Sequence, residues 1–265
     1  MSHYIILDEN LPDQREKLRR YWTVFQTTLG MMMRRNNTYQ TIAHLTYSES
    51  YQSLGQEGFE LTPEQFLNMN FLQFLDYRKQ TGLFQHRFDF SSFWSISDDV
   101  TPTLLLFLPS KPNKDVDVEI YNTFIASIIM IDSQSSRPQI NSFRHFILLV
   151  ERKLGSAVQT KLKQAGNIRF EIYNDASFAF DVTQHCLSPV STLLIRKSNT
   201  ETWEQQEGIN SKQLHYIHEN DQLSVSYGAR VGDIFVLTTM GVSHDLRVEY
   251  KLVIPVSKIE PPKPK

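Results

Sequence analysis

The stretch from Asp181 to Pro255 constrains the fold of this chain more than any other part of the sequence. A strand-like run leads to Pro189, and a short polar segment then precedes a turn at Asn220–Asp221 and a single helical turn. Gly228 is suited to end that helical turn, because glycine adopts the left-handed conformation found at helix C-termini. The signals that follow are a turn at Gly232, an apolar strand over Ile234–Leu237 and a returning hairpin strand over Val248–Ile254. Together these signals predict a small folding unit that carries no catalytic chemistry.

This unit has enough apolar residues for a core of its own. We predict core positions at Leu187, Leu193, Leu194, Ile217, Leu223, Ile234, Val236, Val248, Tyr250 and Leu252. A unit of about 75 residues is small but can fold alone. We therefore expect an N-terminal domain over 12–177, a C-terminal domain over 181–256 that folds as an isolated fragment, and a disordered proline-rich tail over 257–265.

The bulk composition favours an intracellular protein that is not in a membrane. The single cysteine, Cys186, excludes an intrachain disulfide framework and metal sites built from several thiolates. The N-terminus lacks the long apolar run of a signal peptide. The longest apolar run, Phe124–Ile131, is far shorter than the roughly 20 residues that span a bilayer.

The charge distribution gives no sign of a protein that grips nucleic acid alone. The net charge is −2, and 9 of the 27 Lys and Arg and 10 of the 29 Asp and Glu lie from residue 178 onward. Nucleic-acid binding proteins usually carry a basic face or tail. We expect any DNA contact to be local and helped by partners, and the isolated protein to bind duplex DNA weakly or not at all.

Local signals in the first half of the chain indicate helices around an insertion. Apolar residues recur every three or four positions over 13–36, which predicts an amphipathic helix. The stretch Thr38–Gly55 has no clear period and is interpreted as a loop or insertion. Thr62 followed by Pro63 is a strong helix start, and the predicted helix runs to about Gln80.

Strands and helices then alternate, which predicts a mixed α/β domain with a mixed or parallel sheet. The expected helices lie over Tyr121–Ile131 and over 155–166, the second with Ser156 as its N-cap and Gly166 as its stop. The expected strands are Arg87–Ile96, Leu104–Leu108, Val116–Ile120, Phe143–Val150 and Ile168–Ile172.

Two ordered motifs in the C-terminal stretch resemble a known family. The first is an H-x-L-x-P element made by His185, Leu187 and Pro189, and the second places Asp221, Tyr227, Gly228 and Gly232 at the spacing of a D-P-x-x-x-x-F-G-x-x-x-G element. Weaker N-terminal matches, in the same order, are Arg20-Tyr-Trp22 with Thr27, the segment 58–66, Arg87-Phe-Asp89 and Leu104–Pro109. The chain thus resembles the fifth subunit of eukaryotic nuclear RNA polymerases, which has a smaller archaeal counterpart.

Several positions depart from the family pattern. Gln222 stands where the family has proline, Ser191 stands for a second histidine, and Thr239–Ser243 replaces a polar loop. These departures suggest a divergent or specialised copy, such as a paralogue dedicated to one polymerase or the version of a large DNA virus.

The resemblance implies a fold and a function. The N-terminal domain would be a three-layer α/β/α jaw similar to restriction-endonuclease folds, and the C-terminal domain a small α+β assembly domain. The chain would be a non-catalytic subunit of a DNA-dependent RNA polymerase that docks on the largest subunit, contacts other subunits, and meets downstream duplex DNA only within the complex. No cofactor is implied. The location would be the nucleus, or the nucleolus for polymerase I, with a viral factory or virion as the alternative.

The resemblance also implies site residues. The DNA-facing loop and helix would be Lys153, Gly155, Ser156, Lys161 and Lys163, where helix-start N–H groups and cations suit a phosphate, although a plain solvated helix face is an equally good interpretation. The assembly and structural residues would be His185, Leu187, Pro189, Asp221, Tyr227, Gly228, Arg230, Gly232 and Tyr250.

Two other function classes remain open. Glu151-Arg152-Lys153 after an apolar strand, with Asp98 and Asp99 upstream, is typical of a metal-dependent nuclease of the PD-(D/E)xK type. A regulatory adaptor could keep the fold outside a polymerase. We expect no catalytic Cys–His pair at His185 and Cys186, because neighbours in an extended strand point to opposite faces. His215 and His218 have no further ligands at metal spacing, so we expect no zinc site.

Overall fold

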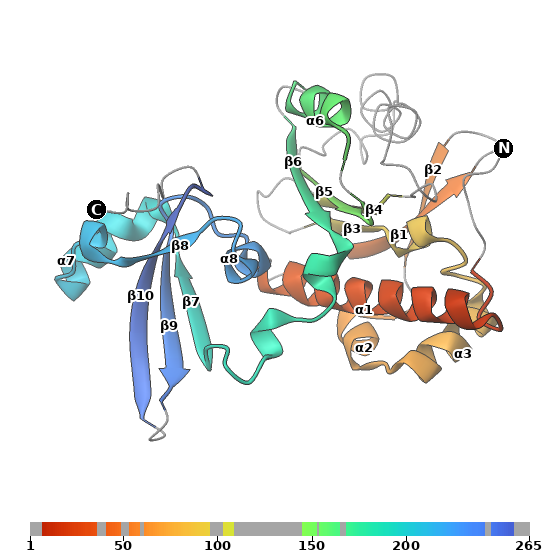
Figure 1. The fold of residues 1–265 in the computed structure, drawn as a ribbon, viewed down its shortest axis with the longest axis horizontal. Coiled ribbons are helices and arrows are strands. Elements are labelled where there is room, and N and C mark those ends of the chain that lie inside the picture. The colour runs from red at the N-terminus through yellow and green to blue at the C-terminus, as the bar shows by residue number, and fades with distance from the viewer. Residues whose placement is uncertain are drawn as a thin grey trace, which may run out of the picture. The chain divides into compact units, whose positions relative to one another are not determined.

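The chain is a mixed α/β protein with two β-sheets that belong to two compact units (Figure 1). The N-terminal unit comprises Met1–Gly30 and Asn36–Phe180, and the C-terminal unit comprises Met31–Arg35 and Asp181–Lys265. The computed structural model describes residues 7–35, 41–48, 53–58, 61–95, 103–108, 145–152, 154–164, 168–241 and 245–256. Within these ranges no helix is long and apolar enough to cross a membrane.

The N-terminal unit is built around a six-stranded sheet of order β2-β1-β3-β4-β5-β6. The strands β4, β5 and β6 are parallel to one another, whereas β1, β2 and β3 join the sheet in antiparallel pairs. The elements are α1 (Pro12–Arg35), β1 (Thr41–Ser48), β2 (Ser53–Gly58), α2 (Pro63–Asn68), α3 (Phe71–Thr81), β3 (Ser92–Ser95), β4 (Thr103–Phe107), β5 (His145–Val150), α6 (Ser156–Lys163) and β6 (Arg169–Asn174), with short 3-10 turns at Arg87–Phe90 and Asp175–Phe178. The predicted mixed α/β class is confirmed.

The core of this unit is an aromatic cluster between helices and sheet. The helix predicted over 13–36 is confirmed as α1, and its apolar stripe is buried. Trp22 stacks on Phe74 of α3 with ring centroids 4.2 Å apart. Phe25 lies edge-on to Phe84 and Phe90, each at 5.6 Å. Figure 1 shows α1, α2 and α3 gathered on one side of the sheet, so this cluster fixes the three helices there.

The single helix predicted from Thr62 to about Gln80 is wrong in one respect, because two helices replace it. Thr62 caps α2 as predicted, with a reciprocal capping box to Gln65. Asn70 forms a second capping box, since its side chain accepts the N–H groups of Leu72 and Gln73 at 3.0 Å each. A strong cap inside a helical pattern starts a new helix. The break leaves Leu72 exposed.

Two further predictions fail for local reasons. The stretch Thr38–Gly55, interpreted as a loop, contains β1 and the start of β2, which pair as an antiparallel hairpin, and β1 also pairs with β3. Its Thr, Ile and Tyr residues suit strands even without regular alternation. The strand predicted over Arg87–Ile96 begins with a 3-10 turn, and only Ser92–Ser95 is extended.

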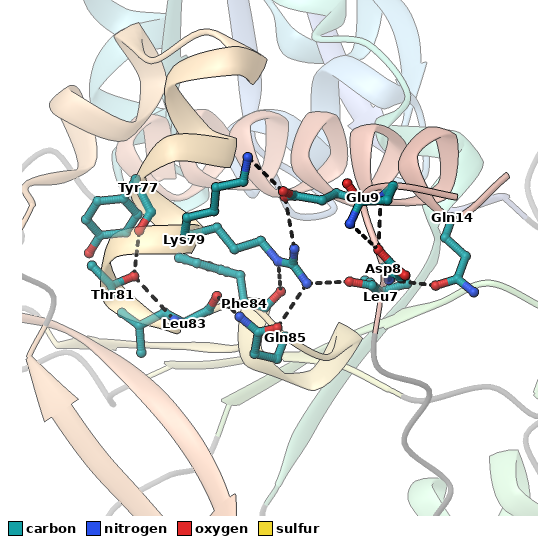
Figure 2. Close-up of polar contacts among 12 residues, drawn as sticks. Leu7, Asp8, Glu9, Gln14, Tyr77, Lys79, Thr81, Leu83, Phe84 and Gln85 are labelled. Atoms are coloured by element: carbon teal, nitrogen blue, oxygen red, sulfur yellow. Dashed lines mark hydrogen bonds and ion pairs between the residues drawn. The ribbon is translucent and has the colours of Figure 1, made fainter. Parts of the chain in front are cut away.

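The segment before α1 is tied down by one buried arginine of α3. Arg78 donates to the carbonyl oxygens of Leu7 and Phe84 and pairs with Glu9 at 3.2 Å, and Figure 2 shows Lys79 reaching the same Glu9. Phe84 is fully buried and has φ of +59°, a value that non-glycine residues rarely adopt. The hydrogen bond from Arg78 to its carbonyl, at 3.0 Å, stabilises this unusual conformation.

The C-terminal unit contains a four-stranded sheet of order β7-β9-β10-β8. The pairs β7/β9 and β9/β10 are antiparallel, and β10/β8 is parallel. The elements are β7 (Ser191–Ile195), α7 (Thr200–Glu207), β8 (His215–His218), α8 (Gln222–Tyr227), β9 (Ile234–Met240) and β10 (Leu246–Ile254), with 3-10 turns at Val182–Gln184, Lys197–Asn199 and Ser211–Gln213. The predicted helical turn, apolar strand and hairpin are confirmed as α8, β9 and β10.

Other expectations about this unit and the linker are corrected or fall outside the structure. The strand-like run before Pro189 is a 3-10 turn followed by further turns, and the polar segment after it holds β7, α7 and β8. The expected strand Val116–Ile120, the expected helix Tyr121–Ile131 and the tail 257–265 lie outside the described residues.

Candidate interaction surface

The two faces of the C-terminal sheet differ sharply. Phe235, Leu237 and Val253 point to one face and form a buried cluster with Ala229. Leu223 and Tyr227 of α8 pack against this cluster, together with Leu194 and Ile217 from the edge strands. This face is therefore a complete small core, covered by α8.

The opposite face is apolar and largely open. The register pairs Leu193 with Val236 and Val236 with Tyr250, and pairs Thr238 with Val248 and Met240 with Leu246, so these residues share one face. Leu193 is 60% exposed, Val248 52% and Leu246 65%. We call the set Leu193, Val236, Thr238, Met240, Leu246, Val248 and Tyr250 the open face.

One end of this side of the sheet is closed by the unit itself. Trp203 of α7 packs its ring on Tyr250 with centroids 5.4 Å apart, and Ile234 is fully buried. The part left open lies toward the hairpin that joins β9 to β10. None of the residues of the open face is charged. A patch of this kind on a folded unit marks an interaction surface, and depletion of charge is typical of the core of a protein interface.

Asp233, which sequence reasoning did not single out as a site residue, organises the loops beside this sheet. The residue is 2% exposed, and its carboxylate accepts the backbone N–H groups of Lys197 and Arg230, both at 2.9 Å. Arg196 pairs with the same carboxylate at 3.1 Å and also donates to the carbonyl of Gly228 at 3.0 Å. The predicted residue Arg230 thus contributes its backbone here, and its side chain is exposed.

The predicted glycines and the cap act on the backbone. Gly228 has φ of +60° and ends α8, and Gly232 has φ of +95° and donates to the carbonyl of Val253 at 2.9 Å. Asp221 caps the start of α8 by accepting the N–H of Leu223 at 2.9 Å. Tyr227 lies edge-on to Phe235, with centroids 6.0 Å apart. These residues shape the unit and offer no reactive group.

The last turn of α1 belongs to this unit. Arg34 forms a two-pronged ion pair with Asp181 at 2.9 and 3.1 Å. Arg35 donates to the carbonyl of Val225 through its Nε at 2.9 Å. A Cβ added at Gly228 would lie 3.2 Å from the Arg35 side chain, so the glycine also makes room for it. The predicted boundaries did not include this turn.

The predicted H-x-L-x-P residues form a turn and not a strand. His185 Nδ1 accepts the N–H of Leu187 at 3.2 Å, and the N–H of Ser188 donates to the His185 carbonyl at 2.9 Å. The extended geometry assumed for His185 and Cys186 is therefore wrong, and Cys186 Sγ lies 4.0 Å from His185 Nδ1. Pro189 is half-buried just before β7, whereas Leu187 is exposed.

The predicted DNA-facing residues lie at the start of α6 where the structure describes them. Gly155 precedes this helix, and Ser156 is its exposed first residue, whose carbonyl accepts a hydrogen bond from Thr160 at 2.9 Å. Lys153 lies outside the described residues. Lys161 and Lys163 are in α6, with side chains outside what the structure describes.

A second polar cluster sits at the carboxyl ends of the parallel strands of the N-terminal unit. Arg87 makes a buried, two-pronged ion pair with Asp175 at 2.6 and 2.8 Å and donates to the carbonyls of Leu108 and Leu149. Burial alone would lower the pKa of Arg87, but the Asp175 carboxylate raises it above its ordinary value. The Arg87 guanidinium also lies 4.8 Å from the ring centre of Tyr21.

Glu151, the carboxylate of the nuclease hypothesis, is engaged in this cluster. It accepts the hydroxyl proton of Tyr21 and lies 3.7 Å from Lys17 Nζ. Asp98 and Asp99 lie outside the described residues. Among the residues that the structure describes, no group of three or more His, Cys, Asp or Glu could hold a metal ion, and this includes His215 and His218. The described part of the chain thus offers no converging carboxylates.

Tyr21 provides a pH-dependent test of this cluster. Burial raises the pKa of its phenol, Arg87 lowers it, and Glu151 raises it further, so the net shift is upward from 10.0. Above pH 10 the unfolded chain releases this proton and the folded chain keeps it, so stability falls as pH rises. The difference in unfolding free energy between wild type and Tyr21→Phe should shrink by about 1.4 kcal/mol per pH unit above pH 10.

Urea denaturation at several alkaline pH values measures this difference. The matched control is Tyr216→Phe at an exposed site of β8, for which the difference from wild type should not change. A constant difference for Tyr21→Phe would show that the Tyr21 hydroxyl ionises as readily in the folded protein as in the unfolded chain.

Comparison with protein-family models and with curated proteins finds no match to this chain.

Proposed function

We propose that this chain is a non-catalytic, structural subunit of a multisubunit DNA-dependent RNA polymerase. Its C-terminal unit would dock on the largest subunit, and phosphodiester chemistry would belong to the large subunits. The observation that carries an assembly role is the open face, an uncharged apolar side of a sheet whose other side already holds a complete core. The ordered motifs from His185 to Asp233 direct the proposal to a polymerase.

The roles of the motif residues fit assembly better than catalysis. Asp221 and Gly228 delimit α8, Gly232 turns the chain into β9, and Tyr227 packs in the core. A motif of caps, turns and core contacts specifies the shape of a docking unit, because none of its members presents an activated nucleophile or a proton-transfer pair.

The N-terminal unit would form a three-layer jaw near downstream DNA, with the start of α6 as the element facing the duplex. The even charge distribution supports contact with DNA only inside a larger assembly. A nuclear location, or a viral factory for a viral copy, follows from the same proposal.

Co-purification tests the proposal directly. The tagged full chain, expressed in its native source, should bring down the largest polymerase subunit in stoichiometric amount, identified by mass spectrometry. Val248→Glu should weaken that association by about tenfold or more, because it places a charge in the core of an apolar interface. The matched control is Leu72→Glu, at a similarly exposed leucine of the N-terminal unit, which should bind as wild type does.

The outcomes separate the rival functions. A wild-type chain that is folded but purifies without a polymerase would contradict the proposal and favour a regulatory adaptor. Metal-dependent cleavage of DNA by the pure chain that is lost in Glu151→Gln would favour the nuclease.

A further inference from the structure

Leu187 is the most exposed large hydrophobic residue of the described chain, at 84%. It lies on the turn between Val182–Gln184 and β7, beside the edge of the four-stranded sheet (Figure 1). A leucine left in water gains nothing for the isolated fold, because burial of a leucine side chain is worth about 1.5–3 kcal/mol. Its position therefore calls for an explanation outside the isolated chain.

The turn that carries Leu187 is held from both sides. The backbone N–H of Leu187 donates to Nδ1 of His185 at 3.2 Å. The N–H of Ser188 donates to the His185 carbonyl at 2.9 Å, the N–H of His185 donates to the Val182 carbonyl at 3.2 Å, and the Ser188 hydroxyl bonds the same Val182 carbonyl. Pro189 follows and fixes its own φ. The leucine is thus presented by a preformed turn, which removes the entropy cost of ordering it on binding.

The surroundings of Leu187 are uncharged. The 14 residues from 182 to 195 contain no Asp, Glu, Lys or Arg, although 21% of the whole chain is charged. Val190 and Leu193 are also well exposed in this segment. Nucleic acid and anionic lipid are bound through Lys and Arg, so neither fits here. A neutral apolar protein surface does fit, since the cores of protein interfaces are depleted of charge.

We infer that Leu187 is a preformed anchor that inserts into a neutral, apolar pocket of the partner subunit, with His185 as the positioning residue that holds the anchor turn. This inference rests on the proposed function and names the contact by which the C-terminal unit engages the largest subunit. Anchors of this kind, buried in a pocket at the centre of an interface, carry a large share of binding energy.

Cys186 gives a native probe of this contact, because it is the only cysteine of the chain, is exposed, and is next to Leu187. The full chain, alone and in complex with the largest subunit, is treated with N-ethylmaleimide, and the modification of Cys186 is followed by mass spectrometry. We expect rapid modification in the free chain and at least about tenfold slower modification in the complex. Equal rates in the two states would overturn the inference.

Three variants separate the anchor from its support. Leu187→Ala should weaken the complex about 30-fold, as expected for removal of an interface anchor. His185→Ala should weaken it several-fold, because the turn loses its acceptor. His185→Asn should restore binding to within about twofold, since an asparagine Oδ1 can accept the N–H two residues ahead in place of Nδ1. Amide exchange at Leu187 in the free chain should follow the same order, fast in His185→Ala and slow in His185→Asn.

The experiment distinguishes this inference from the proposed function. If wild type binds the largest subunit and Leu187→Ala binds equally well, the anchor is wrong and the proposed function survives. If wild type does not bind at all, both are wrong. If Cys186 is protected only at high concentration of the chain alone, the turn is a contact between two copies, and the inference of a pocket on another subunit is overturned.

Discussion

Replacing Arg87 with methionine is expected to lower the free energy of unfolding of the N-terminal unit by about 3–5 kcal/mol. The methionine would fill much of the space, but the Asp175 carboxylate, which is fully buried, would lose its counter-ion. The carbonyls of Leu108 and Leu149 would lose their donors at the same time. An unpaired buried charge is among the most destabilising changes that a single substitution can make.

Urea denaturation of the full chain, followed by circular dichroism, measures this loss. Lys79→Met is the matched control in the same unit, because Lys79 pairs with Glu9 at 2.9 Å but is 60% exposed. Exposed ion pairs contribute about 0–1 kcal/mol, so the control should remain close to wild type. Similar small losses for both variants would mean that Asp175 reaches solvent or another donor when Arg87 is absent.

Replacing Asp233 with alanine is the second large expected effect, with a loss of about 2–4 kcal/mol in the C-terminal unit. The backbone N–H groups of Lys197 and Arg230 would lose their acceptor, and Arg196 would lose its ion pair. The loss should appear as a lower denaturation midpoint of that unit, read from the near-ultraviolet signal of its Trp203–Tyr250 pair.

Asp245→Ala is the matched control for Asp233→Ala. Asp245 also pairs with an arginine of this unit, at 3.3 Å, but both side chains are about half exposed or more. The control should therefore change stability by no more than about 0.5 kcal/mol. A loss at Asp233 no larger than at Asp245 would show that the loops carrying residues 197 and 230 hold their shape without this carboxylate.

The features that the sequence predicted well are those set by neighbours in the chain. Thr62 before Pro63 starts a helix, and Gly228 ends one, because caps and left-handed glycines act within one turn. The strands β5 and β9 were visible as apolar runs bounded by turns. The second cap, at Asn70, was visible too, but the apolar period on either side of it hid the break.

The features that the sequence could not predict depend on partners far along the chain. Arg87 and Asp175 are 88 residues apart, and nothing near either residue marks the pair. Period-two alternation shows which residues of a strand share a face but does not show which face is covered. Leu187, Leu193 and Val248 were accordingly predicted as core positions, yet the structure exposes all three because α8 covers the other side.

The composition of the C-terminal unit has a consequence for synthesis of the chain on the ribosome. Its first piece, Met31–Arg35, leaves the exit tunnel early. Asp181, which receives Arg34, is translated 147 residues later, and Val225, which receives Arg35, is translated 190 residues later. During that interval the two arginines that end α1 lack these acceptors. The unit therefore closes only after translation is almost finished, and a chain released early keeps an arginine-bearing helix end that the quality-control machinery of the cell can recognise.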